Sequence, residues 1–216
     1  MSMTSRLLLV RHGETEWHAE NRYAGVSDVA LTAKGLRQAQ ELGSWAKRRG
    51  VDTVACSPVS RARLTARPAA EALGVEPEVV EGLREVDFGW GEGRTIAEMA
   101  AEDPEAVRRF LDDAELGAFA GSEPPSEAAA RASVALRGLA RRHPGGTVLV
   151  VAHNTLLRMA LCAMLSIPVG RYRLVFPRLD NAAVTEVEVT DTHTALRSLN
   201  VPTWAPLSGG TRNLGT

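Results

Sequence analysis

The chain has 216 residues, 44% of them hydrophobic, and a formal net charge of −1 at neutral pH. This length predicts one domain with a sizeable core, and the near-neutral charge provides no long-range attraction to nucleic acid or to an acidic membrane surface. Because there is no long apolar run, no secretory leader pattern and no disulfide framework, we expect a cytoplasmic protein in which Cys56 and Cys162 are buried free thiols.

Strand and helix patterns alternate along the first part of the chain. The predicted elements are strands at 6–10, 51–56 and 79–80 and helices at 32–49 and 58–73. Thr32 can cap the first helix and Gly50 can end it, while Pro58 suits the first turn of the second. Pro68 lies inside the second helical pattern, where we expect it to kink or interrupt the helix.

The alternation continues after a loop-rich segment. The predicted elements are helices at 95–101, 104–111, 126–142 and 154–165 and strands at 147–152, 172–176, 183–189 and 194–199. Ser126 is the expected cap of the long helix. We expect a single domain over residues 1–200, with a lid-like insertion at about 83–125 and an irregular tail at 201–216. The pattern predicts an α/β fold, a mostly parallel sheet with helices on both faces.

Three of the predicted strands are followed by polar residues and then a helix. Arg11-His12-Gly13-Glu14 follows the first strand, Ser57-Pro58-x-x-Arg61 the second, and His153-Asn154 the strand at 147–152. Because the carboxyl ends of parallel strands share one rim of a sheet, Arg11, His12, Arg61 and His153 are expected to meet there. Two guanidinium groups, two imidazoles and nearby helix N-termini favour a pocket for a tetrahedral dianion. The alternative is a set of strands that end in solvated polar residues.

A fourth segment, residues 83–95, contains a Gly-x-Gly-x-Gly run at Gly89, Gly91 and Gly93. The run lacks the strand-turn-helix context of a dinucleotide-binding fingerprint. The sequence has no triphosphate-binding loop of the Gly-x-x-x-x-Gly-Lys-Ser/Thr type and no Cys/His cluster with zinc-ligand spacing. We therefore expect neither a cofactor nor a metal.

Four segments together resemble the histidine phosphatase superfamily, also called phosphoglycerate mutase-like. They are Arg11-His12-Gly13-Glu14, Ser57-Pro58-x-x-Arg61-Ala62-x-x-Thr65-Ala66, the 83–95 segment and Ala152-His153. The resemblance covers about residues 7–190. It implies a three-layer α/β/α sandwich with a mostly parallel central sheet.

The resemblance also implies a mechanism. His12 would attack phosphorus and become a phosphohistidine, with its tautomer fixed by a backbone carbonyl that accepts from its other ring nitrogen. Arg11, Arg61 and His153 would bind the phosphoryl oxygens, a role that suits a cationic His153.

Glu85 is the expected general acid and base, with a pKa raised by burial. Glu14, Glu16 and Glu92 are the alternative acids in the motif segments.

Two positions depart from the family pattern. His18 stands where the family usually has an asparagine that helps hold phosphate, and Asn154 stands where a glycine is common. We expect His18 to contact the phosphate or another part of the substrate. Asn154 is expected at the phosphate pocket, where its side chain would narrow the pocket or cap the next helix. His143 and His193 are expected to be solvated or in a turn.

The resemblance favours a metal-independent phosphomonoester phosphatase that acts on a small phosphorylated metabolite. Glycolytic mutases of the family carry a longer segment with an Arg-Tyr-Gly stretch after the acid, whereas residues 88–95 resemble the shorter phosphatase version. The alternatives are a mutase-like phosphotransferase and a non-catalytic scaffold that binds a phosphorylated ligand.

Residues 94–125 are expected to roof the site, although core packing explains their apolar members Phe110, Leu111, Leu116 and Phe119 more economically. Trp204 and Leu207 in the tail could serve a homodimer.

Overall fold

The computed structural model describes residues 3–203 and contains a six-stranded sheet in the order β3-β2-β4-β1-β5-β6. The strands are β1 (Ser5–Arg11), β2 (Thr53–Cys56), β3 (Glu78–Val79), β4 (Thr147–Ala152), β5 (Val184–Val189) and β6 (Thr194–Val201). β1, β4, β2 and β3 pair in parallel, whereas β5 and β6 pair antiparallel at one side. The predicted α/β class with a mostly parallel sheet is confirmed.

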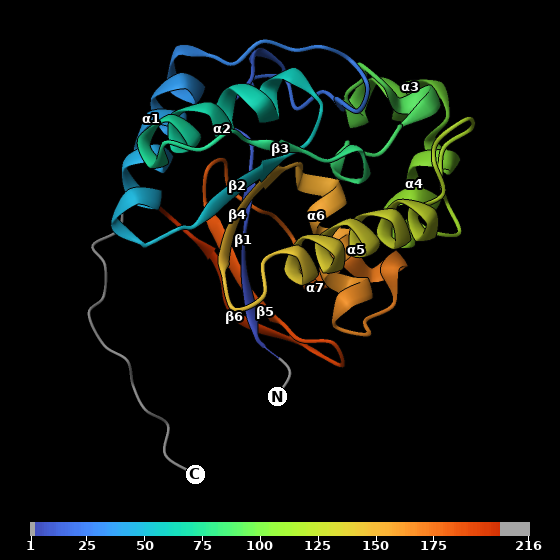
Figure 1. Cartoon of the computed structure of the whole chain (residues 1–216). Coiled ribbons are helices and arrows are strands. Elements are labelled where there is room, and N and C mark those ends of the chain that lie inside the picture. The colour runs from blue at the N-terminus through green and yellow to red at the C-terminus, as the bar shows by residue number, and fades with distance from the viewer. Residues whose placement is uncertain (1–2, 204–216) are drawn as a thin grey trace.

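Helices cover both faces of this sheet (Figure 1). They are α1 (Ala33–Arg48), α2 (Ser60–Leu73), α3 (Ile96–Glu102), α4 (Pro104–Asp112), α5 (Pro125–Arg142), α6 (Asn154–Met164) and α7 (Tyr172–Val175). Successive residues of β1 point to opposite faces, so Leu8 and Val10 pack into the core with α1 and α2, while Leu7 and Leu9 pack into the core with α5 and α6. The result is the expected three-layer sandwich.

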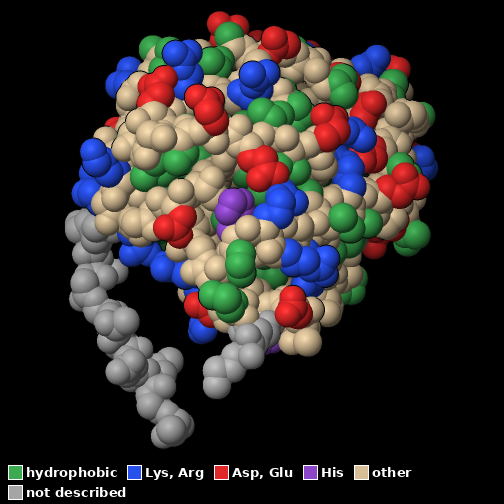
Figure 2. All heavy atoms as spheres, viewed as in Figure 1, with side chains coloured by type: hydrophobic (Ala, Val, Ile, Leu, Met, Phe, Trp, Pro, Cys, Tyr) green, Lys and Arg blue, Asp and Glu red, His purple; other side chains and the backbone are tan. Residues whose placement is uncertain are grey.

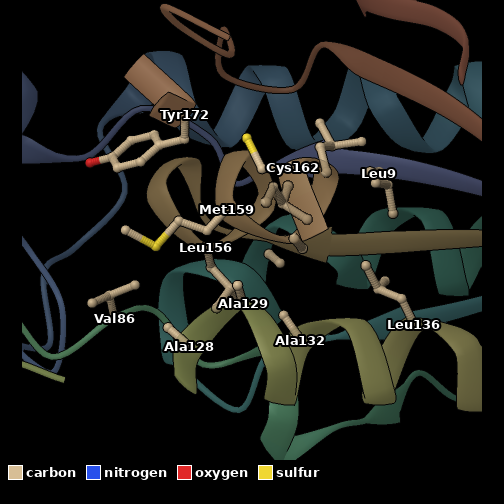
Figure 3. Packing of buried hydrophobic residues seen from close by; sticks show 14 of the residues in the cluster. Leu9, Val86, Ala128, Ala129, Ala132, Leu136, Leu156, Met159, Cys162 and Tyr172 are labelled. Carbon is tan, nitrogen blue, oxygen red and sulfur yellow. The ribbon is translucent and has the colours of Figure 1, made fainter. Parts of the chain in front are cut away.

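Small residues let neighbouring elements approach closely. Ala128, Ala129 and Ala132 of α5 face Leu156 and Met159 of α6 across the core (Figure 3). The loop after β1 approaches α1 in a similar way. A Cβ added to Gly13 would lie 2.6 Å from the carbonyl oxygen of Gly35, and one added to Gly35 would lie 2.1 Å from that of Glu14. Because neither backbone can give way locally, glycine at both positions sets the path of the loop that carries His12.

The prediction of a strand at 172–176 is wrong, because this segment contains helix α7. Its aromatic and β-branched residues favour a strand. However, Tyr172 and Phe176 are buried and Leu174 and Val175 are exposed, which is a spacing of one helical turn rather than an alternation. Packing of Tyr172 and Phe176 into the core therefore overrides the local preference.

The first residues of two helices and the effect of Pro68 also differ from expectation. α2 begins at Ser60, after an extended Val59, so Pro58 lies outside the helix. The helix also continues through Pro68 without interruption. Pro68 cannot donate to the carbonyl of Leu64, but Leu64 lies on the exposed side of the helix. α5 begins at Pro125, so Ser126 lies within its first turn and is not the cap.

Thr32 caps α1 as predicted, by accepting a hydrogen bond from the Gly35 N–H at 3.0 Å. Cys56 and Cys162 are buried free thiols, also as predicted. In residues 3–203, no helix combines the length and the apolarity needed to cross a bilayer. Trp204, Leu207 and the rest of the predicted tail from residue 204 lie outside the described residues.

Candidate active site

The polar residues after β1, β2 and β4 meet at the carboxyl edge of the sheet. The ladders continue one residue past the strands, because the His12 N–H donates to the carbonyl of Ala152 at 3.0 Å and the Ser57 N–H to that of Val151 at 2.9 Å. The imidazole rings of His12 and His153 consequently lie 5.3 Å apart, centre to centre. The expected convergence of two histidines that are distant in sequence is therefore present.

The His12 ring is held in one tautomer. Its Nδ1–H donates to the carbonyl oxygen of Gly13 at 2.7 Å, which leaves the lone pair on Nε2. Burial lowers the pKa of His12 well below 6.5, and the nearby His153, Arg61 and Arg11 lower it further. The ring is therefore neutral at physiological pH, and Nε2 is available as a nucleophile.

Arg61, in the first turn of α2, is fully buried beside this nitrogen. Its Nε–H is directed at His12 Nε2 at 3.3 Å. Its two terminal nitrogens donate to backbone carbonyls of the loop before α1, namely Ser27 at 2.9 Å, Ala24 at 2.7 Å and Gly25 at 3.0 Å. These neutral acceptors fix the guanidinium group but do not cancel its charge, so the space beside His12 attracts anions.

Arg11 extends from β1 toward His18. Its Nη2 lies 2.6 Å from His18 Nε2, its Nη1 donates to the Leu179 carbonyl at 2.8 Å, and its buried Nε has no partner. Burial, followed by the charge of Arg11, lowers the pKa of His18 to about 4. His18 Nε2 therefore accepts from Arg11, and Asn181 Nδ2 approaches the same nitrogen at 3.1 Å.

His153 is fully buried, with Nε2 2.7 Å from the hydroxyl of Ser57 and Nδ1 without a partner. Burial lowers its pKa well below 6.5, and Arg61, Arg131 and Arg11 act in the same direction. Burial and the surrounding arginines therefore both disfavour a positive charge on His153, the state that would best suit the predicted binding of phosphoryl oxygens.

The Glu85 carboxylate lies at the start of α6, where it accepts from the N–H groups of Val86 at 3.0 Å, Thr155 at 3.2 Å and Leu156 at 2.9 Å. Burial raises its pKa, which the backbone donors and Arg61 only partly offset. A raised pKa means that the carboxyl group keeps its proton to a higher pH, which suits a general acid.

The alternative acids are engaged elsewhere. Glu14 pairs with Lys34, Glu92 accepts from the backbone of Gly25 and Ser27, and Glu16 is exposed.

Beside these groups lies a cavity of about 380 Å³, but the fully buried Arg61 and His153 are not among its lining residues. Among the expected site residues, its walls include Arg11, His12, His18, Glu85 and Asn154. From the predicted roof, Ile96 and Leu111 reach the cavity, whereas Phe110 and Phe119 are buried in the core and Leu116 is 86% exposed. Charges of both signs are interspersed over the face drawn in Figure 2, but the cavity is lined by four arginines and one carboxylate, Glu85.

Asn154 begins α6 and its Oδ1 accepts from the Leu179 N–H at 3.2 Å, so its side chain holds the loop before β5 at the rim of the cavity. Sequence reasoning missed Asn181, which donates from Nδ2 to the His12 carbonyl at 2.8 Å, and Thr65, whose hydroxyl accepts from the Gly13 N–H at 2.9 Å. Thr65 lies in the quoted motif around Arg61, but no sequence signal connects Asn181 with the site.

The buried histidines make the stability of the fold depend on pH. The unfolded chain binds a proton at each histidine near pH 6.5, whereas the folded chain leaves His153 neutral. His153 therefore costs the folded state about 1.4 kcal/mol as the pH falls from 7.5 to 5.5. Glu85, with its raised pKa, acts in the opposite direction as the pH falls.

We expect His153→Asn to reduce the loss of unfolding free energy between these two pH values by about that amount, measured by urea denaturation. His193→Asn, at an exposed position, is the matched control for replacing one histidine by asparagine. An identical pH dependence in His153→Asn and the wild type would contradict the assignment of a neutral buried His153.

The chain is similar to known proteins in sequence and in fold. The chain is 30% identical to phosphoserine phosphatase 1 of Hydrogenobacter thermophilus over 91% of its length and 92% of that protein. It is 32% identical to GpmB of Salmonella paratyphi B, named a probable phosphoglycerate mutase, over 85% of its length and 84% of that protein.

Among solved structures, mycobacterial glucosyl-3-phosphoglycerate phosphatase has a TM-score of 0.83 at 26% identity, with 92% of this chain and 99% of the other covered. YhfR of Bacillus stearothermophilus has a TM-score of 0.84 at 30% identity, with 91% and 97% covered. The family model of the histidine phosphatase superfamily (branch 1) matches residues 7–202. With its sheet, its paired histidines and this match over nearly its whole length, the chain belongs to the histidine phosphatase superfamily.

Proposed function

We propose that this protein is a phosphomonoester phosphatase that transfers the phosphoryl group of a small metabolite first to His12 and then to water. The observation that carries the proposal is the state of the His12 ring. Its Nδ1 is committed to the Gly13 carbonyl, and its Nε2 lone pair lies 3.3 Å from the buried Nε of Arg61. A neutral nucleophile beside a fixed cation suits attack on an anionic phosphorus centre.

In the first step, the lone pair of His12 Nε2 forms a bond to phosphorus while the bond from phosphorus to the ester oxygen breaks. The leaving oxygen takes a proton from Glu85, whose raised pKa keeps a protonated fraction available. Arg11, Arg61 and His153 hold the phosphoryl oxygens. The dianion offsets the charge of the arginines and so favours protonation of His153 when the substrate is bound.

In the second step, water attacks the phosphorus of phosphohistidine. The Glu85 carboxylate accepts a proton from this water, the N–P bond breaks with its electron pair returning to Nε2, and inorganic phosphate leaves. His12 is then neutral again and Glu85 is protonated, so the site returns to its starting state. His18 holds Arg11 in position, because its Nε2 accepts from the Arg11 guanidinium group.

Names among the relatives support hydrolysis. A phosphoserine phosphatase and a glucosyl-3-phosphoglycerate phosphatase both match nearly the full chain. The GpmB relative, named a probable phosphoglycerate mutase, supports a second candidate, in which a substrate hydroxyl instead of water receives the phosphoryl group. The two functions share the first step and differ in whether a phosphoglycerate primer is needed.

We therefore expect the purified protein to release phosphate from p-nitrophenyl phosphate with a chelator present and no phosphoglycerate primer. His12→Ala should lower kcat/KM by at least about a thousandfold, because it removes the nucleophile. His193→Ala, at an exposed site, is the matched control and should retain wild-type activity. Strict dependence on a primer would favour the mutase. Absence of turnover over a panel of metabolite phosphates from pH 4 to 9 would favour a binding scaffold.

The role of Glu85 is tested by varying the leaving group. p-Nitrophenolate leaves without a proton, whereas an alkoxide needs one. Glu85→Gln should therefore lower kcat/KM for glycerol phosphate by about a hundredfold or more and affect p-nitrophenyl phosphate much less. Glu16→Gln is the control, because Glu16 is exposed and is not among the residues that line the cavity. Equal losses on both substrates in Glu85→Gln would show that Glu85 does not protonate the leaving group.

A further inference from the structure

Two arginines of the cavity are not explained by the phosphoryl site. Arg158 of α6 and Arg173 of α7 line the cavity together with Arg11. Within residues 3–203, neither Arg158 nor Arg173 forms an ion pair with a carboxylate, and every partner that they contact is neutral. Arg22, the fourth arginine of the cavity, differs because Glu20 and Glu98 neutralise it. The cavity therefore holds two positive charges that the protein leaves uncompensated.

The surroundings of Arg173 fix its guanidinium plane without using its charge. Its central carbon lies 4.0 Å from the centre of the Phe110 ring and 4.9 Å from that of Tyr172. Its Nη2 donates to the Tyr23 hydroxyl at 3.2 Å, and its buried Nη1 has no hydrogen-bond partner. A positioned guanidinium group with an unused donor is suited to binding a carboxylate or phosphate oxygen.

Arg158 supports this group from the neighbouring helix. Its Nε and Nη2 donate to the carbonyls of Phe176 and Pro177, and its central carbon lies 4.6 Å from the centre of the Tyr172 ring. The contacts hold the segment after α7 against α6. Burial lowers the pKa of Arg158, and the charge of Arg173 lowers it as well, so the two cations repel each other across the ring that they share.

The balance of charge in the cavity indicates a ligand with more than one anionic group. A phosphoryl dianion next to His12 is matched by Arg11 and Arg61. Glu85 is the one carboxylate among the cavity-lining residues that the structure describes, and its raised pKa makes it a poor counterion for Arg158 and Arg173. A second anion would relieve the repulsion between these two arginines and satisfy the open donor of Arg173.

We propose that the substrate carries a second anionic group, a carboxylate or a second phosphate, on its leaving-group side, and that Arg173, supported by Arg158, binds it. This inference rests on the proposed phosphatase function. Arg173 is a specificity-determining residue in this account, and Arg158 is a positioning residue that adds charge. The phenolic oxygen of Tyr23, which also lines the cavity, lies beside the same group.

The inference is tested with substrates that differ only in the second anion. In the first pair, racemic 3-phosphoglycerate has a carboxylate where racemic glycerol 1-phosphate has a hydroxymethyl group. In the second pair, 1,3-propanediol bisphosphate has a second phosphate that the monophosphate lacks. We expect the wild type to prefer the anionic member of at least one pair by about tenfold or more in kcat/KM, as for a charge-assisted hydrogen bond. The pair with the larger ratio identifies the second group.

Arg173→Met keeps an apolar stem between Phe110 and Tyr172 and removes the charge. It should reduce the preference ratio at least about tenfold, mainly through KM, and Arg173→Lys should restore part of it. Arg171→Met, two residues away and exposed, is the matched control and should keep the wild-type ratio. Thermal unfolding of each variant checks that the fold is retained.

The outcomes separate this inference from the function on which it rests. Two results would overturn the second anion site if the protein hydrolyses p-nitrophenyl phosphate. One is no preference for the anionic substrate in either pair. The other is the same ratio of kcat/KM values in Arg173→Met as in the wild type. If no ester is hydrolysed, the phosphatase proposal fails instead. Calorimetric titration of His12→Ala with 3-phosphoglycerate and glycerol 1-phosphate then tests the second anion site by binding alone. Tighter binding of 3-phosphoglycerate, with this preference lost when Arg173→Met is added, supports the site. Equal binding of the two compounds contradicts it.

Discussion

The contact between the buried guanidinium group of Arg61 and the Nε2 of His12, at 3.3 Å, is the interaction on which the rest of the site depends. It places a permanent charge, fully removed from solvent, against the nitrogen that the proposed chemistry uses. That charge contributes to the low pKa of both His12 and His153, and it makes the potential there positive, which favours binding of an anion. The backbone carbonyls of Ala24, Gly25 and Ser27 hold Arg61 there without neutralising it. A buried charge without a counterion is costly, and the phosphoryl group of the proposed substrate would offset that cost.

The fold supplies this contact through parallel strands that end together. β1 and β4 deliver His12 and His153 as neighbours, and α2 delivers Arg61 from the next crossover. The hydroxyl of Thr65, one turn further along α2, accepts from the Gly13 N–H and donates to the Arg61 carbonyl, which ties the His12 loop to the helix. Glycines at 13 and 35 permit the loop to run against α1. The chemistry is therefore positioned by backbone hydrogen bonds and close packing, which tolerate little displacement.

Much of the site could be predicted from the sequence. A strand followed by polar residues and then a helix indicates which side chains lie at the carboxyl end of a parallel sheet. The rim containing Arg11, His12, Arg61 and His153 follows from parallel strands alone, and the resemblance to a known family singled out Glu85. What the sequence did not reveal depends on three-dimensional packing. Tyr172 and Phe176 favour a strand locally but become buried on one side of α7, and only that turn brings Arg173 to the cavity. Asn181 reaches the His12 carbonyl from 169 residues away, and no local pattern encodes such a contact. The neutral state of His153 likewise requires knowing how completely it is buried.

The most direct test of the account is to trap the intermediate. The protein is mixed with a phosphorus-labelled monoester, quenched within milliseconds in alkaline denaturant, and mapped by mass spectrometry under conditions that preserve N–P bonds. We expect a label that is stable in base, labile in acid, located on His12 and absent from His12→Ala. A label on another residue would contradict this. So would turnover with no labelled protein at any quench time, together with retained activity in His12→Ala.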